Sequence, residues 1–325
     1  MSNLKIQIAQ LNFLVGDIEG NAQRIVEAAQ AAVGKADLIV FPELALTGYP
    51  PEDLLLRAEF MRRVEAAVAA ILARVNGIHL VVGYPQRWDG RLRNVAGVWR
   101  DGEILAEYAK QLLPNYSVFD EKRYFVPGHE AVTFELKGVH LGLTVCEDIW
   151  QAGPAAMSRA AGAQLLLNIN ASPFHMGKAT EREALVQQRA RENGLPIVYA
   201  NLVGGQDELV FDGGSFVVDG AGVLQQRLPF FEERQALISF NTVQFPLQPL
   251  GGGEVVEMAE EARIYSALVM GVRDYVRKNG FNGAILGLSG GVDSALTLAI
   301  AADALGADQV EVCLLYTSPS PRDRY

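Results

Sequence analysis

The sequence predicts an α/β fold in which two mixed sheets pack face to face with helices outside, followed by the start of a second α/β domain. Short apolar strands alternate with amphipathic helices, hairpins interrupt this alternation, and 50% of the 325 residues are hydrophobic. Strand–helix alternation is typical of parallel pairing, whereas hairpins add antiparallel pairs. The hydrophobic fraction is sufficient to bury a large core.

The composition argues against several classes of protein. The formal net charge is −10, with four histidines and no basic block, so nucleic acid is not expected as a main partner. The chain starts without a charged-then-apolar leader, and no apolar run approaches the length of a membrane span. The two cysteines, Cys146 and Cys313, give no disulfide framework. We expect a cytoplasmic protein with no membrane partner.

The first elements are predicted from periodicity and from turn residues. Alternation indicates strands, helical spacing of apolar residues indicates helices, and Pro42 stops a short buried strand. Asp101-Gly102 is a strong hairpin signal. The predicted elements are a strand at 5–11, a helix at 21–33, a strand at 37–41, a helix at 54–75, a strand at 80–83, and hairpin strands at 94–100 and 103–109.

The next elements continue the same pattern. Gly194 and Pro196 close a helix, and Lys137-Gly138 turns the chain into an apolar strand. The predicted elements are a strand at 139–146, a short helix at 157–161, a strand at 164–169, a loop at 170–174, a helix at 180–193, a strand at 197–201, and hairpin strands at 213–218 and 222–227.

A Pro/Gly-rich stretch, FPLQPLGGGE, predicts a domain boundary. We expect one domain over residues 1–244, a linker over 245–258, and the start of a Rossmann-like domain over 259–313. The second part is predicted as a helix at 256–278, a strand at 284–288, a helix ending near 305 and a strand from 310. A nucleotide-binding domain needs about 100–200 residues, so this one is predicted to be truncated. The polar, Pro-rich residues 314–325 are expected to be a non-native tail.

Three chemically reactive side chains follow apolar strands. Cys146 ends the strand in LGLTVCEDIW, while Glu43 and Lys110 come directly after other strands. Open α/β sheets place their chemistry at the carboxyl ends of strands. A buried structural cysteine is the alternative for Cys146, and a surface carboxylate and a surface amine are the alternatives for the other two. Their shared placement favours a catalytic site.

A cysteine nucleophile needs a base, because a thiol near its free pKa of about 8.5 is mostly protonated at neutral pH. His140 is the nearest histidine in sequence, but it lies six residues earlier on an extended strand, roughly 20 Å away. A carboxylate can do the same work, which makes Glu43 a candidate base. Lys110 would supply a fixed positive charge for an oxyanion.

The contexts FPEL, AKQLLPNY and TVCEDIW resemble those of the nitrilase-superfamily amidases, over residues 5 to about 240. The resemblance implies an αββα sandwich with Cys146 as nucleophile, Glu43 as general base and Lys110 beside the oxyanion. It also implies that the backbone N–H of Glu147 is a second oxyanion donor. Glu121 in FDEKRYF matches a second glutamate that positions the lysine in that superfamily.

The resemblance extends to a branch of the superfamily with a glutaminase role. Tyr49 in LTGYP and Tyr116 in LLPNY match tyrosines of this branch, and Ser172 and Lys178 match its substrate-contact loop. The branch often carries arginine near this position, so Lys178 departs from its pattern. Ordinary loop packing is the alternative for the tyrosines. The implied ligand of these four residues is glutamine.

The segment Ser289-Gly290-Gly291-Val292-Asp293-Ser294 joins a predicted strand to a predicted helix. Its glycines allow close approach of an anion, and helix N–H groups point at that anion. Either Mg²⁺ or a fixed dipole would offset the charge of the aspartate. It lacks the Gly-Lys-Ser/Thr ending of a Walker loop. It resembles the pyrophosphate loop of N-type ATP pyrophosphatases. A Gly-rich turn with no phosphate is the alternative, and no metal site is certain.

The order of the two parts resembles the glutamine-dependent NAD⁺ synthetases, which are ligases of NAD biosynthesis. That family implies glutamine hydrolysis through a cysteine thioester, followed by ATP-dependent amidation of deamido-NAD⁺ with the released ammonia. ATP and Mg²⁺ would serve the second step, the first would need no cofactor, and the protein would form a homo-oligomer. Two alternatives stay open: a stand-alone amidase acting on another small amide, and a non-catalytic assembly fragment.

Overall fold

The computed structural model describes residues 3–243, 245–251 and 253–314. The chain divides into two compact units. The first runs to Gly204 and resumes at Phe211–Met258, and the second contains Gly205–Val210 and the chain from Ala259 on. Within the described residues, no helix combines the length and the apolar character needed to cross a bilayer.

The first unit contains a seven-stranded mixed sheet. Its first three strands in the chain pair in parallel, and the others are antiparallel. The strand order is β15-β14-β1-β2-β3-β4-β5. The bounds are β1 (Asn3–Gln10), β2 (Leu38–Val40), β3 (His79–Trp88), β4 (Arg91–Arg100), β5 (Glu103–Ala109), β14 (Arg234–Asn241) and β15 (Gln248–Pro249).

A second sheet of the same unit has six strands, in the order β13-β12-β9-β8-β7-β6. Its three central strands, β7, β8 and β9, are parallel, so their carboxyl ends lie at one edge. A separate two-stranded sheet pairs β10 (Val203–Gln206) with β11 (Leu209–Asp212). The bounds are β6 (Thr133–Leu136), β7 (Val139–Val145), β8 (Leu165–Asn170), β9 (Ile197–Asn201), β12 (Phe216–Val218) and β13 (Leu224–Arg227).

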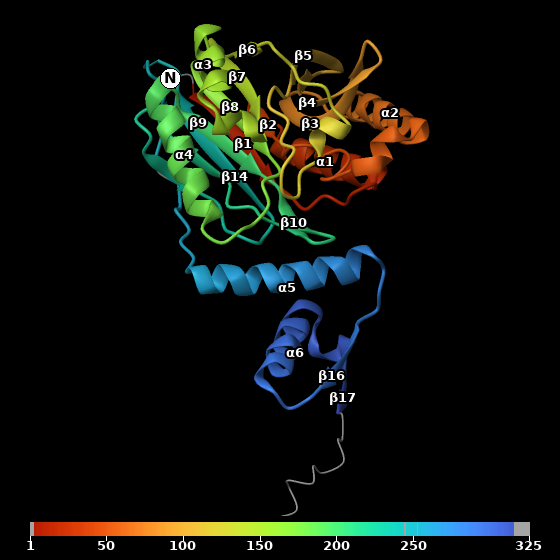
Figure 1. The fold of residues 1–325 in the computed structure, drawn as a ribbon. Coiled ribbons are helices and arrows are strands. Elements are labelled where there is room, and N and C mark those ends of the chain that lie inside the picture. Colours follow the sequence, from red (N-terminus) through yellow and green to blue (C-terminus); the bar gives the residue numbers. More distant parts are fainter. Residues whose placement is uncertain (1–2, 244, 252, 315–325) are drawn as a thin grey trace, which may run out of the picture. The chain divides into compact units, whose positions relative to one another are not determined.

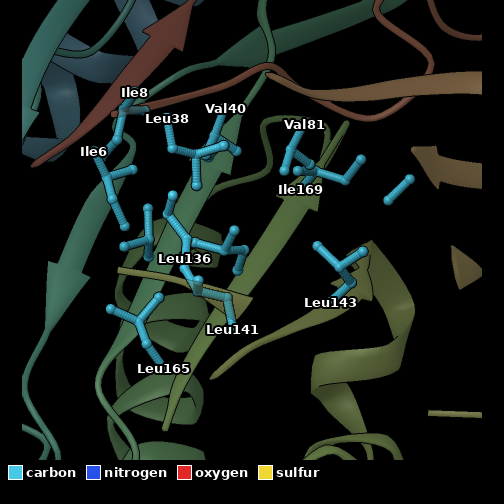
Figure 2. Close-up of a cluster of buried hydrophobic side chains, with 14 of the residues drawn as sticks. Ile6, Ile8, Leu38, Val40, Val81, Leu136, Leu141, Leu143, Leu165 and Ile169 are labelled. Carbon is cyan, nitrogen blue, oxygen red and sulfur yellow. The ribbon is translucent and has the colours of Figure 1, made fainter. Parts of the chain in front are cut away.

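The two sheets bury one shared hydrophobic core (Figure 2). Ile6, Leu38 and Val81 of the first sheet belong to the same buried cluster as Leu141 and Ile169 of the second. Alternate residues of each strand point to one face, so the apolar alternation of the sequence becomes this interface. Burying each such side chain contributes roughly 1.5–3 kcal/mol. The core therefore fixes the strand ends that carry the site.

Helices cover the outer faces of the two sheets (Figure 1). Helices α1 (Ile18–Ala32) and α2 (Ala58–Arg74) lie on one side, and α3 (Ala152–Ala160) and α4 (Lys178–Asn193) lie on the other. Val186 and Ala190 of α4 pack with Leu166 and Ile197 from the outward face of the second sheet. This arrangement is an αββα sandwich, and it confirms the predicted α/β class.

Several elements differ from the expectations. Strand β14 is not evident from the sequence because its first half is mostly exposed and lacks apolar alternation, although it pairs along the whole of β1. The helix expected at 54–75 is a 3₁₀ turn, η1 (Glu52–Leu56), and then α2, with Arg57 extended between them. Helix α3 begins earlier than expected because Pro154 lies in its first turn, where a missing N–H is tolerated.

From Ala259 on, the described elements of the second unit are α5 (Glu260–Lys278), β16 (Ala284–Leu288), α6 (Val292–Leu305), η4 (Ala307–Gln309) and β17 (Val310–Leu314). Strands β16 and β17 are parallel, and α6 connects them as a crossover helix. The expected tail begins at Leu314, which the structure places at the end of β17, and residues 315–325 lie outside the described residues.

Candidate active site

Glu43, Lys110 and Cys146 lie at the ends of three strands of the first unit. Glu43 follows β2, Lys110 directly follows β5, and Cys146 directly follows β7 and starts the 3₁₀ turn η3 (Cys146–Trp150). Their side chains are buried, with residue exposures of 0%, 1% and 5%. Buried charged groups are rare unless they are paired, so their partners decide what they can do.

The carboxylate of Glu43 is held by donors from three different segments. Lys110 Nζ donates to Glu43 Oε1 at 2.8 Å, and Asn94 Nδ2 donates to the same oxygen at 2.7 Å. The backbone N–H of Ala171 donates to Glu43 Oε2 at 2.9 Å. Lys110 Nζ also donates to Glu121 Oε1 at 2.8 Å. One ammonium is therefore shared by two buried carboxylates.

Cys146 occupies a strained turn at the end of its strand. Its φ is +46°, in the left-handed region that non-glycine residues adopt at a cost. Burial raises the pKa of the Cys146 thiol, the charge of Glu43 adds to that effect, and Lys110 opposes it, for a net pKa well above the ordinary value. The resting thiol is protonated, so it can act as a nucleophile only if a nearby base takes its proton.

Burial and mutual charge together set the protonation of Lys110 and Glu121. Burial opposes the charge of Lys110, but Glu121 and Glu43 outweigh it and hold its pKa well above the ordinary value. Burial raises the pKa of Glu121 to about 7, where the charge of Lys110 lowers it and that of Glu43 raises it. Lys110 is thus a permanent cation, while Glu121 is poised to gain or lose a proton near neutrality.

Of the four expected glutamine contacts, Tyr49 and Tyr116 lie in different environments. Tyr49 is buried, and its hydroxyl donates to Glu121 Oε1 at 2.9 Å. Tyr116 is exposed, and its hydroxyl lies 3.1 and 3.0 Å from the two carboxylate oxygens of Glu147. Tyr116 and Glu147 line an open cavity of about 910 Å³ that Lys122 and Gln151 also border. A small polar molecule could therefore meet Tyr116, whereas Tyr49 is placed to support Glu121.

Ser172 follows β8, and Lys178 is the first residue of α4. Ser172 is buried, and its N–H donates to Asn201 Oδ1 at 3.0 Å. Lys178 Nζ lies 3.6 Å from the ring centroid of Trp150, the last residue of η3, and 3.3 Å from Glu181. An ammonium over an aromatic face is attracted by the ring, so this cation is held next to the turn that Cys146 begins.

Asp148 is a buried residue to which the sequence analysis gave no role. Its Oδ1 accepts from the N–H groups of Gln111 (3.1 Å) and Leu112 (2.8 Å), and its Oδ2 accepts from Val145 N–H (3.0 Å) and Tyr108 Oη (2.8 Å). Burial raises the pKa of Asp148 to about 6 against these bonds. One carboxylate thereby ties the chain just after the lysine to the chain just before the cysteine. The sequence feature that could have indicated this role is the second carboxylate of the CED motif, two residues after the cysteine.

The glycine-rich loop of the second unit lies between β16 and α6, as predicted. Gly290 has φ +84°, and the hydroxyls of Ser289 and Ser294 lie 3.2 Å apart. Asp293 is in the first turn of the 14-residue helix. The glycines, hydroxyls and helix N–H groups fit an anion such as a phosphate. Among the described residues, no group of three or more His, Cys, Asp or Glu side chains could hold a metal ion.

Comparison with known families assigns the two parts of the chain, each with its own motifs, to two different families. Residues 5–246 match the model for carbon-nitrogen hydrolase, and residues 264–324 match the model for NAD synthase. A glutamine-dependent NAD(+) synthetase from Xylella fastidiosa (strain 9a5c) is 46% identical over 98% of this chain and 60% of its own length. One from Aquifex aeolicus is 39% identical over 99% and 62%. The chain thus spans about 60% of the length of these relatives.

Solved structures give the same result. A glutamine-dependent NAD⁺ synthetase from Acinetobacter baumannii, in complex with ADP, has a TM-score of 0.91 and 42% identity, covering 99% of this chain and 61% of that one. An amidase from Nesterenkonia sp. has a TM-score of 0.65 and 30% identity, covering 73% and 89%. The first likeness extends through both units, whereas the second covers about three quarters of the chain.

Proposed function

Because the chain belongs to the carbon-nitrogen hydrolase family, we propose that its first unit hydrolyses the side-chain amide of glutamine through a thioester on Cys146. The observation that carries this proposal is the buried bond of 2.8 Å between Lys110 and Glu43, whose charges both act on the Cys146 thiol. The relatives named as glutamine-dependent synthetases support glutamine over another small amide.

The first half-reaction begins with the thiol proton. Glu43 Oε1 accepts from Lys110 and Asn94, whereas Oε2 accepts from Ala171 and keeps a lone pair for this proton. The thiolate attacks the amide carbon of glutamine and forms a tetrahedral intermediate. Lys110 and the N–H of Glu147 are the proposed donors to its oxyanion.

Collapse of this intermediate breaks the C–N bond and leaves the thioester on Cys146, and the departing ammonia takes the proton that Glu43 holds. The second half-reaction regenerates the thiol. Glu43 then accepts a proton from a water molecule, whose oxygen attacks the thioester carbon. The C–S bond breaks, glutamate leaves, and the proton returns from Glu43 to Cys146.

Substrate contacts are proposed for the residues around the nucleophile turn. Tyr116, Ser172 and Lys178 would bind the polar end of glutamine, with Glu147 beside Tyr116. The open cavity bordered by Tyr116 and Glu147 supports an entry route from that side. Tyr49 is proposed to act through Glu121, because its hydroxyl already donates to that carboxylate.

For the whole protein of which this chain spans part, we propose a glutamine-dependent NAD⁺ synthetase. Its second domain would use ATP with Mg²⁺ to activate deamido-NAD⁺ and would amidate it with ammonia. The loop at residues 289–294 would bind the pyrophosphate of ATP, and both family models in one chain support this order of steps. We further propose that the protein is cytoplasmic, which its two free cysteines support because thiols stay reduced in that compartment. We also propose that it forms a homo-oligomer, which light scattering would test.

Replacing the nucleophile tests the proposed function. Cys146→Ala should abolish ammonia release from glutamine, because no thioester can form, and an enzyme-coupled ammonia assay would measure the loss. Cys313→Ala is the matched control, since Cys313 is exposed in the second unit and should be dispensable for this step. Retained ammonia release by Cys146→Ala would refute the assignment. A clear preference of the wild-type chain for another amide would favour a stand-alone amidase.

A further inference from the structure

A buried ion pair, Arg182 with Asp212, has no part in the mechanism above. Arg182 Nη1 and Nη2 each donate to Asp212 Oδ1 at 3.0 Å, and Nη2 donates to Oδ2 at 2.8 Å. The two side chains are 2% and 1% exposed. Burial opposes the charge of Arg182, but Asp212 outweighs it and raises the pKa of the guanidinium, so the pair stays ionised.

Such a pair adds little net stability, because desolvating two charges offsets their attraction. Apolar side chains of similar volume often stabilise a fold as well or better. What a buried forked pair does supply is a fixed geometry, since the planar guanidinium and the carboxylate accept only a narrow range of orientations. The other contacts of the pair therefore indicate what it positions.

Both partners reach the backbone of the loop that follows β8. Arg182 Nη1 lies 3.4 Å from the carbonyl oxygen of Ser172. Asp212 Oδ1 accepts from Asn201 Nδ2 at 3.3 Å, and Asn201 Oδ1 accepts from the N–H of Ser172 at 3.0 Å. The peptide groups on both sides of Ser172 are thus held by the ion pair, one directly and one through an amide.

The preceding peptide group of this loop contacts the proposed base. Ala171 N–H donates to Glu43 Oε2, the oxygen that we assign to the thiol proton. A shift of the loop would move this donor and turn the carboxylate. A misplacement of about 1 Å can cost about 10²-fold in rate, so the position of Ala171 matters for proton transfer.

We propose that Arg182 and Asp212 are positioning residues, whose ion pair fixes the loop at residues 171–172 and thereby the carboxylate of Glu43 and the substrate contact Ser172. The inference rests on the proposed function, because that function gives Glu43 its role as base. It assigns a task in the reaction to two residues that touch neither the thiol nor the proposed substrate.

Single and double variants separate positioning from stability. Arg182→Met and Asp212→Leu each leave one buried charge unpaired, so each should lower the melting temperature by several degrees. The double variant Arg182→Met/Asp212→Leu removes both charges and should recover most of that loss. We expect its kcat for glutamine to stay at least about tenfold below wild type, with KM also raised because Ser172 is displaced.

A matched control breaks another ion pair of the same helix, through its partner on β13. Glu183, the neighbour of Arg182 on α4, pairs with Arg227, which also pairs with Glu257. Arg227→Met breaks these pairs without touching the loop, so it should lower stability and leave kcat and KM unchanged. Recovery of both melting temperature and kcat in the double variant would overturn the proposal, because the pair would then serve stability alone.

A substrate-independent readout separates this inference from the proposed function. Peptide mapping of iodoacetamide alkylation gives the rate at Cys146, with the exposed Cys313 of the same chain as internal reference. In the double variant Cys146 should react at least about tenfold more slowly than in wild type, with Cys313 unchanged. An equal rate at Cys146 would contradict the inference even if glutamine is not the substrate. Failure of glutamine turnover by wild type would instead contradict the proposed function.

Discussion

Glu121 shares the ammonium of Lys110 with Glu43, and its burial makes its own charge depend on pH in the working range. Burial raises its pKa from 4.5 to about 7. A carboxyl with a raised folded pKa keeps a proton that the unfolded chain has already lost. The stability that Glu121 contributes in this way is present below about pH 4.5 and is lost as the pH rises through about 7.

This residue gives a prediction for pH dependence. The glutamine of Glu121→Gln has no carboxyl proton to lose, so the stability of this variant should not fall over that pH range as the wild-type stability does. The free energy of unfolding of the variant relative to wild type should therefore become more favourable as the pH rises from about 5 to about 7, and should level off above about 8. Urea unfolding at a series of pH values measures it. A difference that does not vary with pH would show that Glu121 is ionised throughout.

At the scale of elements, the placement of Glu43 depends on a glycine in the neighbouring strand. A Cβ at Gly83 of β3 would lie 2.4 Å from Leu44 N, 2.5 Å from Pro42 O and 2.7 Å from Glu43 Cα. These are backbone atoms, which cannot rotate away. The turn that follows β2 can therefore lie against β3 only because that position has no side chain.

The corresponding prediction is a loss of rate from a single methyl group. Gly83→Ala should displace the turn and lower kcat for glutamine by about ten- to a hundredfold, as expected for a shift of up to 1 Å in the base. Gly97→Ala in β4 is the control, because its Cβ meets the side chains of Trp99 and Tyr84 at 2.6 and 2.7 Å instead. It should lower stability with a much smaller effect on kcat; equal losses of kcat would contradict this account.

The sequence predicts well those elements whose signals are local. Strand β5, strand β9 and the strand–loop–helix at β16 and α6 follow from periodicity and turn residues, and the motif contexts carry Glu43, Lys110 and Cys146. Contacts made across long stretches of chain were not predictable in this way. Ala171 N–H binds Glu43 across 128 residues and Asn94 binds it across 51, and neither residue type marks such a role. Strand β14 was missed because its pairing with β1, not its own periodicity, makes it a strand.

At the scale of the whole molecule, each of the two units carries one constellation and one cysteine. Glu43, Lys110 and Cys146 lie within the first unit, and the glycine-rich loop and Cys313 lie within the second. Both are consistent with the two family models that the chain matches. We assign the hydrolysis of glutamine's side-chain amide to the first of these constellations alone.

The most direct test of that claim is site-resolved labelling with a chloroketone analogue of glutamine, followed by peptide mass spectrometry and the ammonia assay. We expect one label per chain, on Cys146, with loss of ammonia release in proportion to labelling and with protection by glutamine. Cys313 should remain unlabelled at the same dose, although it is the more exposed thiol. Inactivation with the label on another residue, or ammonia release that persists when Cys146 is fully labelled, would show that Cys146 is not the nucleophile.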